Sequence, residues 1–153
     1  MSKAKKILFA FLLGFIAMQF IHPARNHSSA VQTADMVAHF NTPDNVVGIL
    51  KVSCYDCHSN NTRYPWYANV QPVGWFLANH VKNGKEELNF NEFTVYSKRR
   101  QLSKLRSVQN SIKDGSMPLS SFTMLHNDAK LSEESKASIL EWTAKVIDSL
   151  SRQ

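Results

Sequence analysis

The only two cysteines of the chain stand three residues apart, in the segment Cys54-Tyr55-Asp56-Cys57-His58. In a helical turn, residues at i, i+3 and i+4 share one face, so this spacing brings Cys54, Cys57 and His58 to the same side of the backbone. Two cysteines are too few to form a disulfide scaffold. The sequence therefore predicts a local helical turn that presents two sulfurs and one imidazole together.

A C-x-x-C pair followed by His is the attachment pattern of c-type haem. Both sulfurs can reach the two vinyl groups at one porphyrin edge, and His58 can reach the iron. The pattern leaves three alternatives: a thioredoxin-like redox pair, a structural disulfide, and a zinc site completed by a residue such as His80. The first lacks a βαβ pattern, and adjacent Cys and His fit one tetrahedral zinc ion poorly. We predict one haem c, covalently bound through Cys54 and Cys57, with His58 as an axial ligand.

The second axial ligand decides the chemistry of such an iron. Met117 stands in Gly115-Ser116-Met117-Pro118, after a predicted helix, where the stiff backbone before Pro118 can present the thioether. It follows His58 by about 60 residues, enough chain to circle a haem. We predict Met117 as the second ligand. The alternatives are His80, His126 and Met124, of which His80 is also explained as a packed histidine and Met124 as core filler.

Residues 1–25 have the pattern of an export signal, with Lys3, Lys5 and Lys6 before a run over 7–21 that has one polar member, Gln19. As a helix, this run is about 22 Å long, short of a hydrocarbon core of about 30 Å. We predict a single-pass inner-membrane anchor with the following domain in the periplasm. The alternative is a signal peptide that is cut, which would leave a soluble periplasmic protein.

The net charge of +6 does not indicate nucleic-acid binding. Residues 1–25 contain four basic and no acidic residues, and the remaining chain has 14 basic and 12 acidic residues, a net charge of only +2. This balance is too small for an electrostatic surface that binds DNA or RNA. The predicted partners are instead the membrane, through the N-terminal helix, and redox proteins.

The rest of the chain divides into a polar linker over 26–41 and a domain over 42–153. Helices are predicted over 42–54, 72–84, 94–113 and 132–150, with Thr42 and Ser132 as N-caps and Gly115 at a helix C-terminus. No strand pattern is present. We therefore predict an all-α, cytochrome c-like domain of three to five helices wrapped around one covalently attached haem, which would fill an otherwise thin core.

Several segments together resemble a known family. They are Phe20-Ile21-His22-Pro23, the run CYDCHSNNTRYPWY from Cys54, Pro72 and Trp75, His80-Val81, Gly84, Leu88-Asn89-Phe90, Met117-Pro118, His126, Leu131-Ser132 and Trp142. Over about 42–145, the chain resembles the small haem-binding domain family, exported monohaem cytochrome c-like proteins of Bacteroidetes-type bacteria. The resemblance implies that Cys54 and Cys57 attach the haem and that His58 is the proximal ligand. It also includes positions equivalent to His80 and His126, so both stay open as ligands.

We expect one-electron transfer in the periplasm or at the outer face of the inner membrane. No nucleophile–base pair, paired carboxylates or phosphate-binding loop indicates an enzyme, so no catalytic residue is predicted. The alternative is a haem-based sensor or a peroxidase-like enzyme with an open or exchangeable sixth position. A third hypothesis is a tether that holds haem near a larger complex.

Overall fold

The computed structural model describes residues 2–152, and these residues form helices with no strand. The α-helices are α1 (Lys3–Met18), α2 (Met36–His39), α3 (Asp44–Ser53), α4 (Tyr55–His58), α5 (Val73–Glu87), α6 (Lys98–Lys113), α7 (Ser120–Leu125) and α8 (Glu133–Arg152). Three 3-10 helices complete the order: η1 (Trp66–Asn69), η2 (Phe90–Val95) and η3 (Asn127–Ala129). The predicted all-α class is confirmed. The described helices outnumber the predicted three to five because α2, α4 and α7 are too short to show a helical period.

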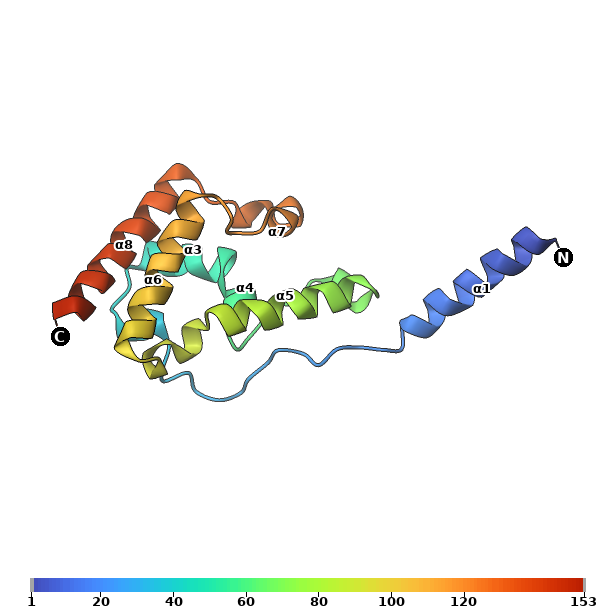
Figure 1. The fold of residues 1–153 in the computed structure, drawn as a ribbon, viewed down its shortest axis with the longest axis horizontal. Coiled ribbons are helices and arrows are strands. Elements are labelled where there is room, and N and C mark those ends of the chain that lie inside the picture. The colour runs from blue at the N-terminus through green and yellow to red at the C-terminus, as the bar shows by residue number, and fades with distance from the viewer. Residues whose placement is uncertain (1, 153) are drawn as a thin grey trace.

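The core lies where α6 and α8 pack against each other and α3 packs against α8 (Figure 1). The helix predicted over 132–150 is present as α8, and its apolar stripe is buried: Ile139, Trp142, Val146 and Leu150. Helix α6 contributes Leu105 and Ile112 to the same cluster, and α3 contributes Val46 and Leu50. The amphipathic helices therefore bury the faces that their periodicity indicates.

Two predicted helix ends are confirmed by their hydrogen bonds and dihedral angles. Ser132 Oγ accepts a hydrogen bond from the backbone N–H of Ser135 at 3.1 Å, at the start of α8. Gly115 follows the end of α6 with a φ of 72°, a conformation that side chains with a Cβ disfavour. Helix α5 runs three residues past the predicted end at Gly84.

Two other predicted boundaries are wrong. Thr42 does not cap α3, since its hydroxyl donates to the carbonyl of Val37 at 3.0 Å and Pro43 precedes the first helical residue. Helix α6 begins at Lys98 rather than near 94, because the preceding residues form η2 and bury Phe90 and Phe93 in the core. Tertiary burial here overrides the helical period of the sequence.

The segment 26–41, predicted as a linker, is attached to the domain along its length. Asn26 donates from Nδ2 to the carbonyl of Ser59 at 2.8 Å. Asp35 caps α2 by accepting from the N–H of Val37 at 2.9 Å, and Met36 is only 1% exposed. This segment therefore contributes to the core instead of merely spacing it from the N-terminus.

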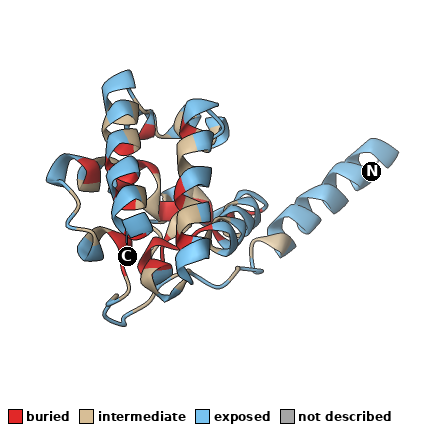
Figure 2. Ribbon diagram, turned by 60° about the vertical axis from the view of Figure 1, so that its left-hand side comes forward, coloured by how far each residue is buried: buried red, intermediate tan, exposed pale blue. Residues whose placement is uncertain are grey.

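The predicted N-terminal helix is present as α1, which projects away from the domain (Figure 1). None of its residues is buried, and Figure 2 shows exposed positions along it while buried residues gather inside the domain. Among residues 2–152, no helix is both long and apolar enough to cross a membrane. The structure thus gives no support to the transmembrane part of the prediction.

Candidate cofactor site

A cavity of about 200 Å³ opens between the C-terminal part of α3, α4, the end of α5, and α6. Most of its wall is apolar. The apolar lining residues are Leu50, Leu88, Phe90, Val108, Ile112, Met117, Pro118 and Leu131. Cys54 and His58 also line it. Its apolar lining has the character of the sites that small-molecule cofactors occupy in proteins.

The turn that carries the two cysteines is closed locally. The carbonyl of Cys54 accepts hydrogen bonds from the N–H groups of Cys57 at 3.2 Å and His58 at 3.0 Å. Because both bonds lie within five consecutive residues, the motif determines its own helical turn. Cys54 and His58 face the same cavity, whereas Cys57, which the spacing predicts on the same side, is absent from its lining.

Cys57 lies half-buried against α5 and does not line the cavity itself. The contact is close because Gly84 has no side chain. A Cβ at Gly84 would lie 2.7 Å from the carbonyl oxygen of Cys57 and 3.2 Å from its Cβ. Gly84 therefore sets the distance between α5 and the cysteine turn.

The two residues between the cysteines anchor this turn on opposite sides. Tyr55 donates to Asp35 Oδ2 at 3.1 Å, and its ring stacks on Phe90 with the centroids 5.0 Å apart. The buried carboxylate of Asp56 accepts from the backbone N–H and from Nε of Arg63, both at 3.1 Å. Tyr55 and Asp56 thus hold the turn in place and so fix the positions of Cys54, Cys57 and His58.

The orientation of His58 is determined by one hydrogen bond. Its Nδ1 lies 3.0 Å from the carbonyl oxygen of Leu88, which can only accept, so Nδ1 carries the proton. Burial lowers the pKa of His58 below 6.5, against smaller opposing effects of backbone carbonyls. The neutral imidazole keeps a free lone pair on Nε2, the arrangement that a metal-binding histidine requires.

The two cysteines are free thiols and form no disulfide with each other. Burial is the main cause that raises the pKa of Cys54 to about 12 and that of Cys57 to about 11, with nearby negative charge adding to both. Within residues 2–152, no three His, Cys, Asp or Glu side chains are grouped to hold a metal ion. The structure therefore shows neither the disulfide nor the zinc alternative.

The candidates for the second axial ligand are separated by the structure. Met117 lines the cavity together with His58. His126 lies outside its lining, 2.6 Å from the hydroxyl of Tyr67 and stacked on Phe122. His80 is exposed on α5, and Met124 is 72% exposed on α7. Only Met117 of these four shares a cavity with His58.

Polar residues also line the cavity, and of these Ser107, Ser111 and Glu87 were not singled out from the sequence. Lys104, Ser107 and Ser111 line it from α6, and Glu87 lines it from the end of α5, where its carboxylate lies 3.4 Å from Lys104 Nζ. Their spacing of three to four residues along α6 is a signal that they share a face. The sequence does not indicate that this face borders the cavity.

These features define a small all-α protein with a mostly apolar cavity that is lined by a histidine and a cysteine of one turn. The model of the haem-binding domain family matches residues 13–145, so the chain belongs to this family of haem-binding proteins. No curated protein and no solved structure matches the chain. The residues present fit a haem, because an apolar cavity, a correctly protonated imidazole and a thiol meet at one place.

Proposed function

We propose that the protein binds one haem c covalently, through thioether bonds to Cys54 and Cys57, with His58 as an axial ligand. The observation that carries this proposal is the hydrogen bond from His58 Nδ1 to Leu88, beside Cys54 on the wall of an apolar cavity. That bond holds the tautomer whose Nε2 can bind iron before any cofactor arrives. Neither thiol is engaged in a disulfide.

Met117 is proposed as the second axial ligand, and electron transfer as the function. A thioether on the second side of the iron closes it to substrates and stabilises the reduced form. A bound haem supplies a one-electron couple at the iron. The apolar residues of the cavity exclude water from it, and Lys104 and Glu87 place opposite charges at the wall. This arrangement suits exchange of single electrons with partner redox proteins.

One observation favours the alternative of a sensor or peroxidase-like protein. Met117 is 38% exposed and belongs to the connection between α6 and α7, so its side chain is less constrained than that of His58. A ligand that detaches would open the sixth position to a diatomic gas or a peroxide. Carbon monoxide binding to the ferrous protein distinguishes the two functions, since a firmly ligated iron binds it slowly.

We also propose that the domain works in the periplasm, at the outer face of the inner membrane, with α1 as its membrane attachment. Three lysines surround the start of α1, its remaining surface is apolar on all sides, and none of its residues packs into the domain. Cleavage after export is the alternative. The mass of the mature protein and its accessibility to protease in spheroplasts test both points.

The test of covalent attachment is expression with the cytochrome c maturation machinery, followed by a haem stain on a denaturing gel. We expect stain at the position of the protein, and its loss in the double variant Cys54→Ala/Cys57→Ala. A wild-type band without stain would overturn covalent attachment. Haem that binds to the native protein but is lost in denaturant would show non-covalent binding, so haem binding would stand and the thioether bonds would not.

The test of Met117 compares two methionine variants of the haem-loaded protein. Met117→Ala should remove the sulfur-to-iron charge-transfer band in the far red and convert the ferric haem to high spin. Met124→Ala, which alters an exposed methionine outside the cavity, should leave the spectrum unchanged. An unchanged spectrum in Met117→Ala would remove Met117 from the site.

A further inference from the structure

One end of the domain exposes a set of large apolar side chains. Trp66 of η1 is 78% exposed, Phe76 near the start of α5 is 66% exposed, and Phe20 after α1 is 80% exposed. We call this set the apolar end and define it as Phe20, Ile21, Trp66, Val73, Trp75 and Phe76. An exposed group of this kind marks an interaction surface rather than ordinary surface variation.

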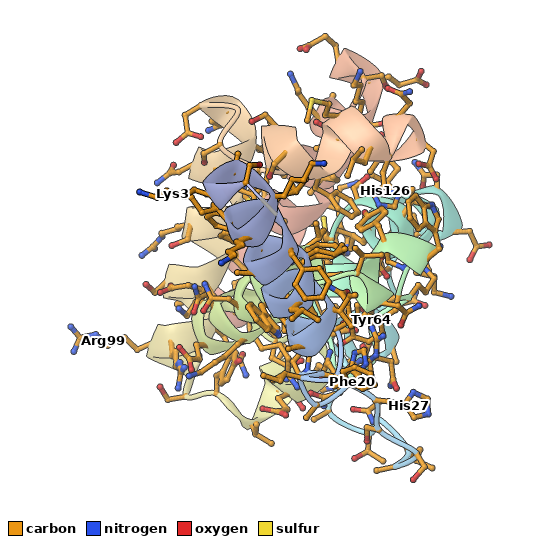
Figure 3. All side chains as sticks on the ribbon, turned by 90° about the vertical axis from the view of Figure 1, so that its right-hand side faces the viewer. Lys3, Phe20, His27, Tyr64, Arg99 and His126 are labelled. Carbon is orange, nitrogen blue, oxygen red and sulfur yellow. The ribbon has the colours of Figure 1, made fainter. Side chains whose placement is uncertain are left out.

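Helix α1 is attached at this same end. The side chain of Gln19 makes two hydrogen bonds to the backbone of Gln71, at 2.9 and 3.1 Å. The indole N–H of Trp75 donates to the carbonyl of Ile21 at 2.9 Å. Figure 1 shows the C-terminal end of α1 on the side of the domain where α5 starts, and Figure 3 looks onto this side with α1 in front. The apolar surface of α1 therefore continues into the apolar end.

The residues that follow α1 fix this arrangement. Arg25 stacks over the ring of Tyr64 at 4.2 Å and contacts Asn69. Asn26 Oδ1 accepts from Lys85 Nζ at 2.7 Å, and the backbone N–H of Asn26 donates to the hydroxyl of Tyr64. These contacts tie the connection to the loop before η1 and to the side of α5. The domain is held against the base of α1 instead of hanging from a free tether.

The charges are distributed to suit an anionic surface. The N-terminal 25 residues, which include α1, Phe20 and Ile21, contain four lysine and arginine residues and no acidic residue. Residues 64–81, which include the rest of the apolar end, contain no lysine, arginine, aspartate or glutamate. Tryptophan and other aromatic side chains are favoured at the boundary between lipid and water. Cationic residues beside apolar ones are the combination by which proteins bind anionic lipid surfaces.

We propose that the apolar end rests on the surface of an anionic lipid bilayer, as a second membrane contact beside α1. The proposal rests on the proposed function in one respect, which is that α1 is retained and associates with the membrane. It does not require α1 to cross the bilayer. Its consequence is that the haem cavity is held at a set height and orientation above the lipid.

The test is footprinting of the full chain with a water-soluble diazirine, with and without vesicles of phosphatidylethanolamine and phosphatidylglycerol. Flotation of the vesicles reports membrane association, and mass spectrometry reports labelling of each peptide. We expect labelling of Trp66 to fall several-fold on vesicles. Labelling of Val95, which is 72% exposed in η2, should stay unchanged as the internal control.

The other outcomes overturn the proposal in distinguishable ways. A chain that floats with Trp66 still labelled loses the docking surface but keeps α1 as its attachment. A chain that does not float loses both membrane contacts, while the haem proposal is unaffected. Protection of Trp66 without vesicles would show that a second copy of the chain covers the apolar end.

Two matched variants sharpen the result. Trp66→Asp adds a charge at an exposed site, so the fold should persist while Trp75 regains its labelling on vesicles. Val95→Asp makes the same change on a comparably exposed residue of η2 and should leave the protection of Trp75 unaltered. If Trp75 were labelled equally in the two variants on vesicles, the proposal would be overturned. Full protection of Trp66 on vesicles of zwitterionic phosphatidylcholine alone would overturn the requirement for anionic lipid.

Discussion

The Nδ1 atom of His58 and the carbonyl oxygen of Leu88 lie 3.0 Å apart, and this hydrogen bond joins the cysteine turn to the end of α5. It links the two sides of the cavity through the residue that we propose as iron ligand. Because Leu88 supplies a backbone atom, the bond depends on the path of the chain and not on a particular side chain. Its effects are best tested through His58 and through the packing of α5 on the turn.

Replacing His58 by Ala should leave the haem attached through the cysteines but remove one axial ligand. We expect the ferric spectrum to become high spin, and added imidazole to restore the low-spin spectrum by entering the space that the side chain leaves. His39→Ala is the control, because His39 is exposed on α2. A low-spin spectrum in His58→Ala without imidazole would contradict the assignment.

Replacing Gly84 by Ala should push α5 away from the cysteine turn, since the new Cβ would lie 2.7 Å from a backbone oxygen of Cys57. We expect the free energy of unfolding to fall by about 1–3 kcal/mol. Gly48→Ala is the matched control in α3, where a Cβ meets no atom within 4 Å. It should raise the free energy of unfolding by about 0.5–1 kcal/mol. Urea titration measures both changes. If the two variants changed the free energy of unfolding in the same direction, the prediction would be contradicted.

Tyr55 should make stability depend on alkaline pH. Burial, followed by the charge of Asp35, raises the pKa of Tyr55 above its ordinary value of 10.0. Its contribution is fully present below about pH 10 and is lost as the pH rises further, because only the unfolded chain then ionises readily.

Tyr55→Phe should remove this part of the alkaline loss of stability and cost about 1–3 kcal/mol near neutral pH, because Asp35 loses a donor. Urea unfolding of both proteins at several pH values above neutrality provides the measurement. Parallel loss of stability in the two proteins would mean that another group is responsible.

Trp142 should tolerate Phe far better than Ala. Its indole N–H is buried and has no hydrogen-bond partner among residues 2–152. Trp142→Phe removes that unpaired group along with some packing, so we expect a change within about 1 kcal/mol. Trp142→Ala should lower the free energy of unfolding by about 3–5 kcal/mol through the cavity it creates. A loss in Trp142→Phe as large as in Trp142→Ala would show that the N–H is bonded in solution.

Much of the candidate site could be predicted because its chemistry is local. The turn from Cys54 to His58 closes on hydrogen bonds between residues at most four apart, so the spacing alone indicated it. The same applies to the cap at Ser132 and the positive φ at Gly115. Thr42 failed as a cap because its hydroxyl found a partner in Val37, which belongs to a segment that the sequence suggested was a linker.

The sequence alone could not decide which candidate lies near His58. Met117 and His126 follow His58 at long separations, where helical periodicity gives no information on distance. Only the position of α6 across the cavity from the end of α3 and the cysteine turn brought Met117 to the cavity, and only the contact with Tyr67 placed His126 elsewhere. Short elements such as α2 and α7 escaped prediction because tertiary contacts, and not their own periodicity, hold them.

By itself, the sequence determined the helical class, the apolar N-terminal segment, and the turn that offers two thiols and an imidazole. These depend on residue type and on spacings of a few residues, which set backbone hydrogen bonds and helix faces. Tertiary structure alone decided the proton on His58 Nδ1, the close approach at Gly84 and the attachment of α1 to the start of α5. Each of these joins segments far apart in the chain, and such contacts are selected by the packing of the whole domain.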